Sequence, residues 1–294
     1  MNRFIVQVLV LAIVVVMASC APNDLSIRLA YSRLDNVLYE RLSSYADFDE
    51  DQLAWIEAES REYQLWHRQT ELPEYADFFA RVATMVESGE LLTTNDVDVL
   101  LVELESFSSR GYRHSPFANS TAFLKQISDQ QVLDIARYFE NKNTEWLQHL
   151  QKHDNALGND ERIDRLQSTL DRIDLSLNLE QRQILDSGFD QYIGRREDRI
   201  TAWKNWQRQF LAILEDRSSE NFSVLMPAHL DAYRRQMKVQ YPERSEKNRQ
   251  IAVQTVTDLL NSLDKTQRFR LITTLRTSEE VLASMAVSKQ TTLL

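Results

Sequence analysis

One set of side chains has the types and spacing of a metal site. Glu145, His149 and His153 follow one another at intervals of four, so a helix would place all three on one face. Two imidazoles and a carboxylate can bind zinc, and a metal-dependent hydrolase is therefore one alternative. The order differs from the HExxH pattern of metalloproteases, where the glutamate directly follows the first histidine. Because Lys152 and Asp154 flank His153, we favour a solvated helix end and expect no metal.

A second set of candidates begins at Trp66. His67 and Glu71 are four residues apart, which on a helix permits an ion pair. We expect this pair to lie at the surface before Pro73 and to shape the chain rather than to perform acid–base chemistry. Trp66, in contrast, is expected to be buried against the following helix. Trp66, His67 and Glu71 are therefore candidates for a structural joint or a partner-binding surface.

Other signals of enzymatic chemistry are missing from the sequence. It contains no Gly-rich phosphate loop and no GxSxG nucleophile elbow, and its one cysteine lies near the N-terminus. We therefore expect a protein that is not an enzyme and that uses no cofactor. The formal net charge of -10 also disfavours nucleic acid, because phosphates are bound by basic patches.

The N-terminal segment has the features of an export signal. Arg3 is followed by residues 4–17, which are apolar except for Gln7. This run is shorter than the roughly 20 residues of a membrane-spanning helix and suits the core of a signal peptide. Small residues then precede Cys20, an order that resembles the lipobox of bacterial lipoproteins. The alternative is an ordinary secretory signal with an incidental cysteine.

The lipobox resemblance has three implications. Residues 1–19 would be removed, Cys20 would become the lipidated N-terminus, and residues 20–24 would form a tether to the membrane. Ala21 follows the cysteine, and the sorting rules of lipoproteins then favour the periplasmic face of the outer membrane.

The elements that must position these residues are helices. Glycine and proline number five each in 294 residues, far below average usage of about 7 and 5 per cent, and strands need the turns that these residues make. Apolar residues recur at helical spacing, most clearly over residues 47–86. We expect an all-α, elongated multi-helix bundle over residues 25–288, with residues 289–294 as a frayed tail.

Three stretches of this bundle carry specific predictions. Pro73 is expected either to kink its helix or to begin a new helix capped by Thr70. Residues 108–116 contain Gly, Ser and Pro together and are expected to form a loop. Residues 179–216 could form one long helix, although two glycines weaken its centre.

Five segments share a local pattern: an apolar residue, a capping residue, two variable residues, then Gln or Asp. In such a capping box the short side chain accepts from a free helix amide, and the Gln or Asp reaches back to the amide of the capping residue. The pattern predicts helix starts after Asp49, Thr93, Ser128, Asn178 and Asp264.

Several motifs together resemble a known family. After the lipobox come Leu29-Ala30-Tyr31, Trp66-His67-Arg68 and Glu71-Leu72-Pro73. They are similar to the corresponding parts of a group of Gram-negative lipoproteins defined only by a domain of unknown function, over nearly all of the mature chain. This resemblance implies an all-helical envelope lipoprotein and transfers no functional residue. The five capping segments are also similar, more weakly, to the LTxxQ motif of Spy-type periplasmic chaperones.

These observations favour a non-enzymatic binding or scaffold lipoprotein that presents a helical surface to an envelope protein. A periplasmic chaperone that holds unfolded clients is an alternative of the same class. The metal-dependent hydrolase built on His149 and His153 is the alternative from another class.

Overall fold

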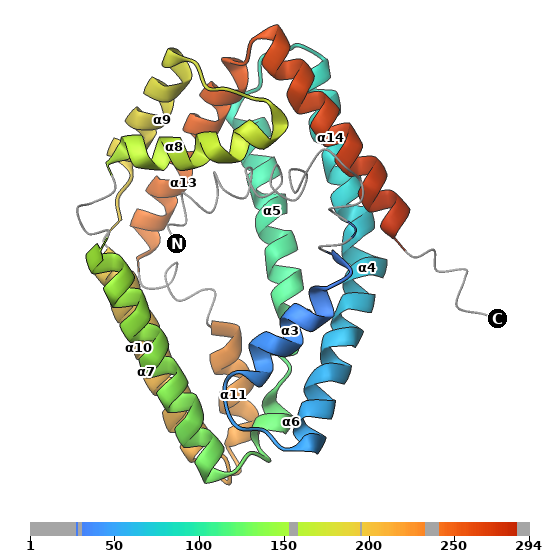
Figure 1. Ribbon diagram of the computed structural model, residues 1–294. Helices are drawn as coiled ribbons and strands as arrows, with labels where there is room; N and C mark the ends of the chain where they lie inside the picture. The colour runs from blue at the N-terminus through green and yellow to red at the C-terminus, as the bar shows by residue number, and fades with distance from the viewer. Residues whose placement is uncertain (1–27, 29–30, 153–157, 195, 233–240, 287–294) are drawn as a thin grey trace, which may run out of the picture.

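The computed structural model describes residue 28 and residues 31–152, 158–194, 196–232 and 241–286. These residues form helices and contain no strand, which confirms the all-α fold (Figure 1). In chain order the helices are α3 (Leu34–Ser43), α4 (Glu50–Glu87), α5 (Thr94–His114), α6 (Thr121–Leu124), α7 (Asp129–Lys152), α8 (Asn159–Leu170), the 3-10 turn η1 (Asp171–Ile173), α9 (Leu179–Gln191), α10 (Arg196–Glu215), α11 (Phe222–Ala232), α13 (Pro242–Asn261) and α14 (Lys265–Met285).

The long helix α4 connects the two ends of the molecule. Its 38 residues span about 57 Å at 1.5 Å per residue. The helix continues through Pro73, so the alternative of a new helix capped by Thr70 is wrong. Proline inside a helix costs about 3 kcal/mol because an amide is lost and the ring crowds the preceding turn. The buried side chains on both sides of it, including Leu72 and Ala76, offset that cost.

The loop predicted over residues 108–116 is wrong for most of its length, because α5 continues to His114. Gly111 lies within this helix and faces α4. A Cβ atom at Gly111 would lie 3.3 Å from the hydroxyl oxygen of Tyr63. The glycine therefore serves close packing between α4 and α5 here and does not end the helix.

The single long helix considered for residues 179–216 is also wrong. The chain forms α9 and α10, with a break after Gln191. Asn248 of α13 holds this break, since its side chain accepts from the Ile193 amide (2.9 Å) and donates to the Ile193 carbonyl (2.6 Å). A bond from a distant helix thus decides where α9 ends.

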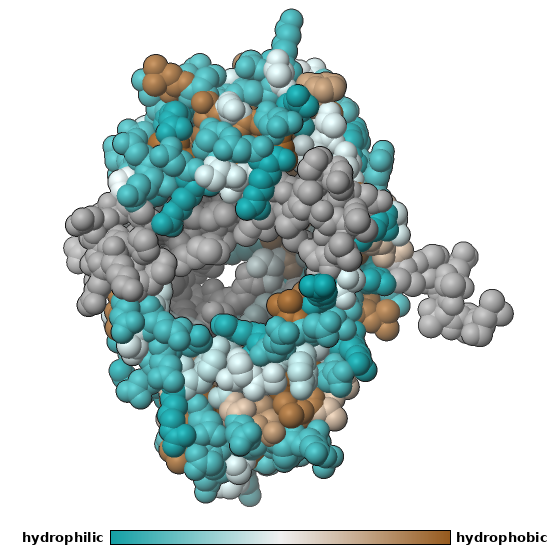
Figure 2. Space-filling view, in the orientation of Figure 1, coloured by the Kyte–Doolittle hydropathy of each residue, from teal (hydrophilic) through white to brown (hydrophobic). Residues whose placement is uncertain are grey.

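Buried apolar side chains form two separate cores. The large core lies among α4, α5, α8, α9, α13 and α14, and the small core lies among α6, α7, α10 and α11. α4 and α5 run along one side between the two ends, with α7 and α10 on the opposite side (Figure 1). The space-filling view shows an opening between them (Figure 2). The elongated bundle is thus built around two cores.

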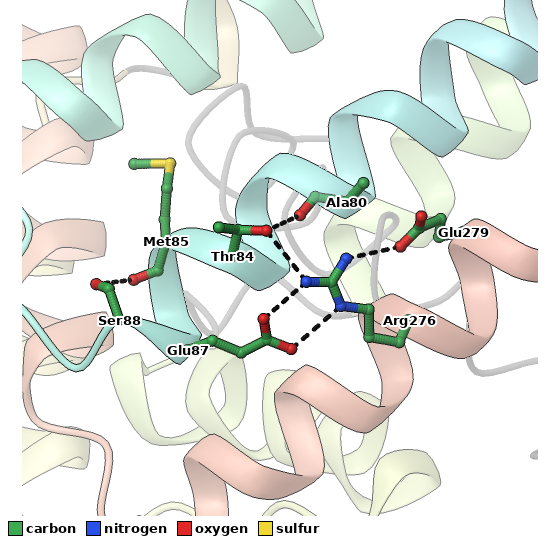
Figure 3. A network of polar contacts seen from close by, with 7 residues as sticks. All are labelled: Ala80, Thr84, Met85, Glu87, Ser88, Arg276 and Glu279. Atoms are coloured by element: carbon green, nitrogen blue, oxygen red, sulfur yellow. Dashed lines mark hydrogen bonds and ion pairs between the residues drawn. The ribbon is translucent and has the colours of Figure 1, made fainter.

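An arginine joins α14 to the C-terminal end of α4 (Figure 3). The Arg276 guanidinium donates to both carboxylate oxygens of Glu87 (3.1 and 2.7 Å), to the Thr84 hydroxyl (3.1 Å) and to Glu279 (3.0 Å). Its hydrogen bonds to Glu87 and Glu279 raise the pKa of Arg276 above the ordinary value. Exposed ion pairs contribute little to stability, so we assign this group to fixing how α14 lies along α4.

All five predicted capping boxes are confirmed. In each, the capping side chain accepts from the amide three residues later, and the Gln or Asp at that position accepts from the amide of the capping residue. Two pairs of these boxes also bond to each other. Gln52 and Gln131, the first glutamine pair, exchange hydrogen bonds of 3.2 and 2.5 Å. Gln181 and Gln267, the second glutamine pair, exchange bonds of 2.7 and 2.9 Å. The helices that begin at the first pair, α4 and α7, start at the opposite end of the molecule from α9 and α14, which begin at the second pair (Figure 1).

Candidate functional site at the middle of α4

A cluster of buried polar and aromatic side chains lies in the middle of α4. At its centre is His67, which is 8 % exposed. Its Nδ1 lies 3.1 Å from the Tyr31 hydroxyl, and its Nε2 lies 3.3 Å from the Tyr75 hydroxyl. The Tyr31 hydroxyl also donates to the Gln64 carbonyl (3.3 Å), so it accepts from His67 Nδ1–H. Tyr75 then donates to Nε2, and this network assigns His67 as a neutral ring protonated on Nδ1.

The same contacts fasten the segment before α3 onto α4. The Gln64 side chain donates to the Tyr31 carbonyl (2.7 Å), and the buried Tyr31 ring lies 5.7 Å from the His67 ring. Arg28 donates to the Ser284 hydroxyl on α14 (2.5 Å). The beginning of the described chain is therefore attached to two helices of the large core.

Glu71 does not pair with His67, and this prediction is wrong. The Glu71 carboxylate is completely buried and accepts two bonds from Arg110 on α5, from Nε (2.8 Å) and Nη2 (3.0 Å). Arg110 also donates to the Ser106 hydroxyl (3.2 Å). A two-bond pair with arginine holds both carboxylate oxygens, and it therefore joins α4 to α5. The pair lies beside the large core, since the Arg110 guanidinium is 5.0 Å from the centre of the Phe107 ring.

The expected roles of Trp66 and His67 are reversed. Trp66 is only partly buried, and its ring stacks on that of the exposed His114 at a centroid distance of 3.9 Å. His67 occupies the interior position instead. Adjacent helical residues point about 100° apart, so the apolar periodicity that included Trp66 placed the buried face one residue too early.

Burial sets the protonation states of this cluster. It lowers the pKa of His67 to about 4, against an opposing effect of the Glu71 charge. Burial also raises the pKa of Tyr31 to about 12 and raises that of Tyr75. At neutral pH the histidine and both phenols are therefore uncharged. The charges of Glu71 and Arg110 face each other, and the hydrogen bond to Glu71 raises the pKa of Arg110.

Three contributors to this cluster were missed in the sequence. Tyr75 is eight residues after His67 and could have been found, since that spacing keeps two residues on one helix face. Tyr31 and Arg110 come from other elements and have no local signal. Their recruitment depends on how the segment before α3 and helix α5 pack on α4.

Comparison with known protein families identifies one match, which covers most of the helices described above. A family model described as "Family of unknown function (DUF6279)" matches residues 44–229, more than half of the chain. The chain belongs to this family. The matched part of the chain begins just before α4 and ends within α11. It therefore contains His67, Glu71 and Arg110 but leaves out Tyr31. No curated protein and no solved structure matches the chain.

The remaining predicted residues lie elsewhere. Glu145 on α7 pairs with Lys142 (2.7 Å) and is 62 % exposed. The side chain of His149 and all of His153 lie outside the described residues. Cys20 lies outside them as well, together with the signal segment, the tether and the tail predicted over 289–294. Within the described ranges, no three His, Cys, Asp or Glu residues form a group that could hold a metal ion. None of the described helices has both the length and the apolar character needed to cross a membrane.

Proposed function

We propose that this protein is an outer-membrane lipoprotein, anchored at Cys20 on the periplasmic face, that serves as a non-enzymatic binding or scaffold module for an envelope protein. The attachment of Tyr31 to α4 is the observation that carries the proposal. An anchored module holds its surface toward a partner only if the chain from the anchor ends at a rigid point. Tyr31 meets that need, because its hydroxyl and carbonyl are both bonded to α4.

Chain geometry limits how far this module lies from the lipid. Eight residue steps separate Cys20 from Arg28, and an extended chain covers at most about 3.3 to 3.6 Å per step. The end of α14 that Arg28 contacts would therefore stay within about 30 Å of the anchor. Lipidation supplies about 0.8 kcal/mol per buried CH2, so more than one acyl chain gives stable membrane association.

The bonding at the middle of α4 supports a structural rather than a catalytic task. Both ring nitrogens of His67 are engaged by tyrosines, and both oxygens of Glu71 are engaged by Arg110. A general base must instead direct a lone pair at a substrate proton. The residues most capable of chemistry in this cluster therefore hold helices together.

Metabolic labelling with a fatty-acid analogue tests the anchor. The wild-type protein is expected to be labelled and to fractionate with the outer membrane, whereas Cys20→Ser is expected to lose the label. Labelling that persists in Cys20→Ser would contradict the anchor. Zinc bound stoichiometrically by the purified protein and lost in His149→Ala would favour the hydrolase instead.

Cross-linking tests the binding role separately. A photoreactive residue replacing Leu65, which is 52 % exposed on α4, is expected to capture a defined envelope protein in cells. Tyr31→Ala should weaken this cross-link while fatty-acid labelling stays unchanged, because the anchor remains but its rigid attachment is lost. An undiminished cross-link in Tyr31→Ala would show that the attachment does not orient the module.

A further inference from the structure

An open groove lies beside the first glutamine pair, at the end of the molecule where α4 and α7 begin. One wall is the segment 44–47 before α4, and the other is a face of α7. The groove has a volume of about 530 Å³ and is open to solvent along one side. We call it the α7 groove. Its volume lies within the range of about 300 to 1,000 Å³ that is typical of small-molecule sites.

Two aromatic rings form part of this groove. Tyr45 from the segment and Tyr138 from α7 are both partly exposed, with ring centroids 4.4 Å apart and planes inclined by 40°. The Tyr45 ring also meets Phe139 of the small core edge-on at 6.1 Å. The aromatic surface is therefore supported from behind by the core, while part of it remains open to a ligand.

Polar side chains with planar ends lie beside these rings on the same face of α7. Asp134 accepts from Gln130 (3.0 Å) and from Arg137 (2.9 Å), which fixes its carboxylate. Arg137 remains 65 % exposed, and Asn141 is exposed one turn further along. These groups offer several donors and acceptors along one line beside the aromatic surface.

The first glutamine pair holds both walls in place. Gln131 at the start of α7 donates to the Asp47 carbonyl in the opposite wall (2.9 Å) and bonds to Gln52 of α4. A ligand would therefore meet walls that are already positioned and would pay little for ordering them.

Charge and shape together indicate the class of ligand. The lining residues Asp47 and Asp134 against Arg137 give a formal charge of -1, and the Lys142 ammonium lies 5.8 Å from the centre of the Tyr138 ring. The carboxylates and cations beside the groove therefore balance, which gives no net attraction for an anion. A sugar ring has a C–H face that suits the negative face of an aromatic ring, and hydroxyls around its edge that suit amide, carboxylate and guanidinium groups. We propose that the α7 groove binds a neutral oligosaccharide, with Tyr45 and Tyr138 against a pyranose face and Gln130, Arg137 and Asn141 bonding its hydroxyls. This site is independent of the anchor and of the protein partner proposed above.

The opposite end of the molecule provides a matched control. A groove of about 320 Å³ between α9 and α13 is lined by polar side chains such as Gln183, Gln254 and Asp258, and none of the described residues that line it is aromatic. If amides and carboxylates alone bound the sugar, this groove would bind it as well. The aromatic pair is what distinguishes the α7 groove.

Calorimetric titration of the detergent-solubilised full-length protein tests the proposal, with tetra-N-acetylchitotetraose and maltotetraose as neutral probes. At least one of them is expected to bind, and Tyr138→Ala should weaken that binding by about tenfold or more. Tyr138→Phe should bind like the wild type because the ring face is kept. Gln254→Ala, in the control groove, should change the affinity by less than about twofold.

Melting curves show whether Tyr138→Ala is folded. If it is not, Asn141→Ala replaces it, because Asn141 is exposed and its side chain can be shortened without disturbing the core. The proposal is overturned if neither sugar binds at millimolar concentration. It is also overturned if an extended peptide displaces the sugar and binds more tightly, or if Gln254→Ala rather than the α7 variants weakens binding. Loss of fatty-acid labelling would leave this assay unaffected, so the two proposals fail separately.

Discussion

The two glutamine pairs use the same bonds in different surroundings. In each pair, every side-chain oxygen accepts from the amide of its own capping residue and from its partner glutamine. Gln131 also donates to the Asp47 carbonyl, and Gln267 also donates to the Ser176 carbonyl. In both cases the carbonyl lies two residues before the residue that caps the partner's helix. Gln181 does the same toward Ser262, and it is completely buried. Gln52 is only partly buried, and its oxygen and amide group make three of the bonds described here.

This difference shows that one local motif can serve two purposes. At the second pair all four bonding positions of both glutamines are used, and the helices continue into the large core. At the first pair the same joint stands at the edge of the small core, and beside it the α7 groove stays open. The first pair therefore positions a surface, while the second closes an interior.

The largest expected effect comes from removing the Glu71–Arg110 pair, which joins α4 to α5 between these two ends. Arg110→Ala would leave the Glu71 carboxylate buried without a partner, since Glu71 is completely buried. Breaking a buried pair in this way costs about 3 to 5 kcal/mol. Urea melts are expected to show this loss, and amide exchange should accelerate along α4 toward both ends.

Glu71→Gln combined with Arg110→Ala provides the control for this joint. The double variant should recover a large part of the loss, because no charge remains buried. A single variant within about 1 kcal/mol of the wild type would instead mean that water reaches Glu71, as surface pairs are worth about that much or less.

Acid is expected to weaken the middle of α4 through His67. Its pKa falls from 6.5 to about 4 on folding because the ring is buried, so the unfolded chain takes up the proton first as the pH drops. The stability that His67 contributes is present above pH 6.5 and is lost as the pH falls toward 4. The total loss is about 3 kcal/mol, at 1.36 kcal/mol for each pKa unit.

The matched variant for this titration is His67→Phe, which keeps a ring but cannot take up a proton. The difference in unfolding free energy between His67→Phe and the wild type should change between pH 6.5 and 4 and should level off below that range. A constant difference across that range would show that His67 is already protonated in the folded protein or remains accessible to water.

The sequence predicts what is decided within a few residues. All five capping boxes are found correctly because each one depends on a short side chain and on Gln or Asp three positions later. The pairing of these boxes joins residues about 80 positions apart, and no spacing rule applies at that distance. Closeness in sequence predicts a pair between Glu71 and His67, whereas the packing of α5 on α4 gives Glu71 its actual partner, Arg110. Gly111 indicated a loop, but the close approach of Tyr63 gives it a role inside a helix.

A direct test of the comparison is to remove one glutamine from each pair. Gln181→Ala would leave the Ser262 carbonyl, the Asn178 amide and the Gln267 side chain without buried partners. Of these groups the Gln267 side chain is buried, the Ser262 carbonyl belongs to a partly buried residue, and the Asn178 amide belongs to an exposed residue that water can reach. A buried group left unbonded costs about 1 to 3 kcal/mol, so we expect a loss of about 3 kcal/mol, most of it from Gln267 and Ser262. Gln52→Ala should cost about 1 kcal/mol, because water can replace its bonds at a partly exposed site.

Denaturant melts of the two variants measure this difference directly. Equal losses would mean that burial does not distinguish the pairs and that both act only as caps. Sugar binding gives the opposite order: Gln52→Ala should weaken it by loosening the walls of the α7 groove, and Gln181→Ala should leave it unchanged.

A last comparison concerns how closely two helices approach each other seven residues after each glutamine pair. Seven residues after Gln181, Gly188 of α9 faces α13 so closely that a Cβ atom there would lie 2.4 Å from Thr255 Oγ1 and 2.9 Å from its Cγ2. Seven residues after Gln52, α4 carries Glu59, which is partly exposed. Gly188→Ala is therefore expected to destabilise the protein by about 1 to 3 kcal/mol through overpacking, even though alanine is the better helix former.

Thr255→Ala removes both crowding atoms and should suppress the effect of Gly188→Ala in a double-mutant cycle. The Thr255 hydroxyl bonds only within its own helix, to the Ile251 carbonyl, so its removal costs little by itself. Gly158→Ala is the matched control, because a Cβ atom at Gly158 would meet nothing within 4 Å. If Gly188→Ala were harmless, α9 and α13 would have room to separate. The helices beside the second glutamine pair would then be packed no more tightly than those beside the first.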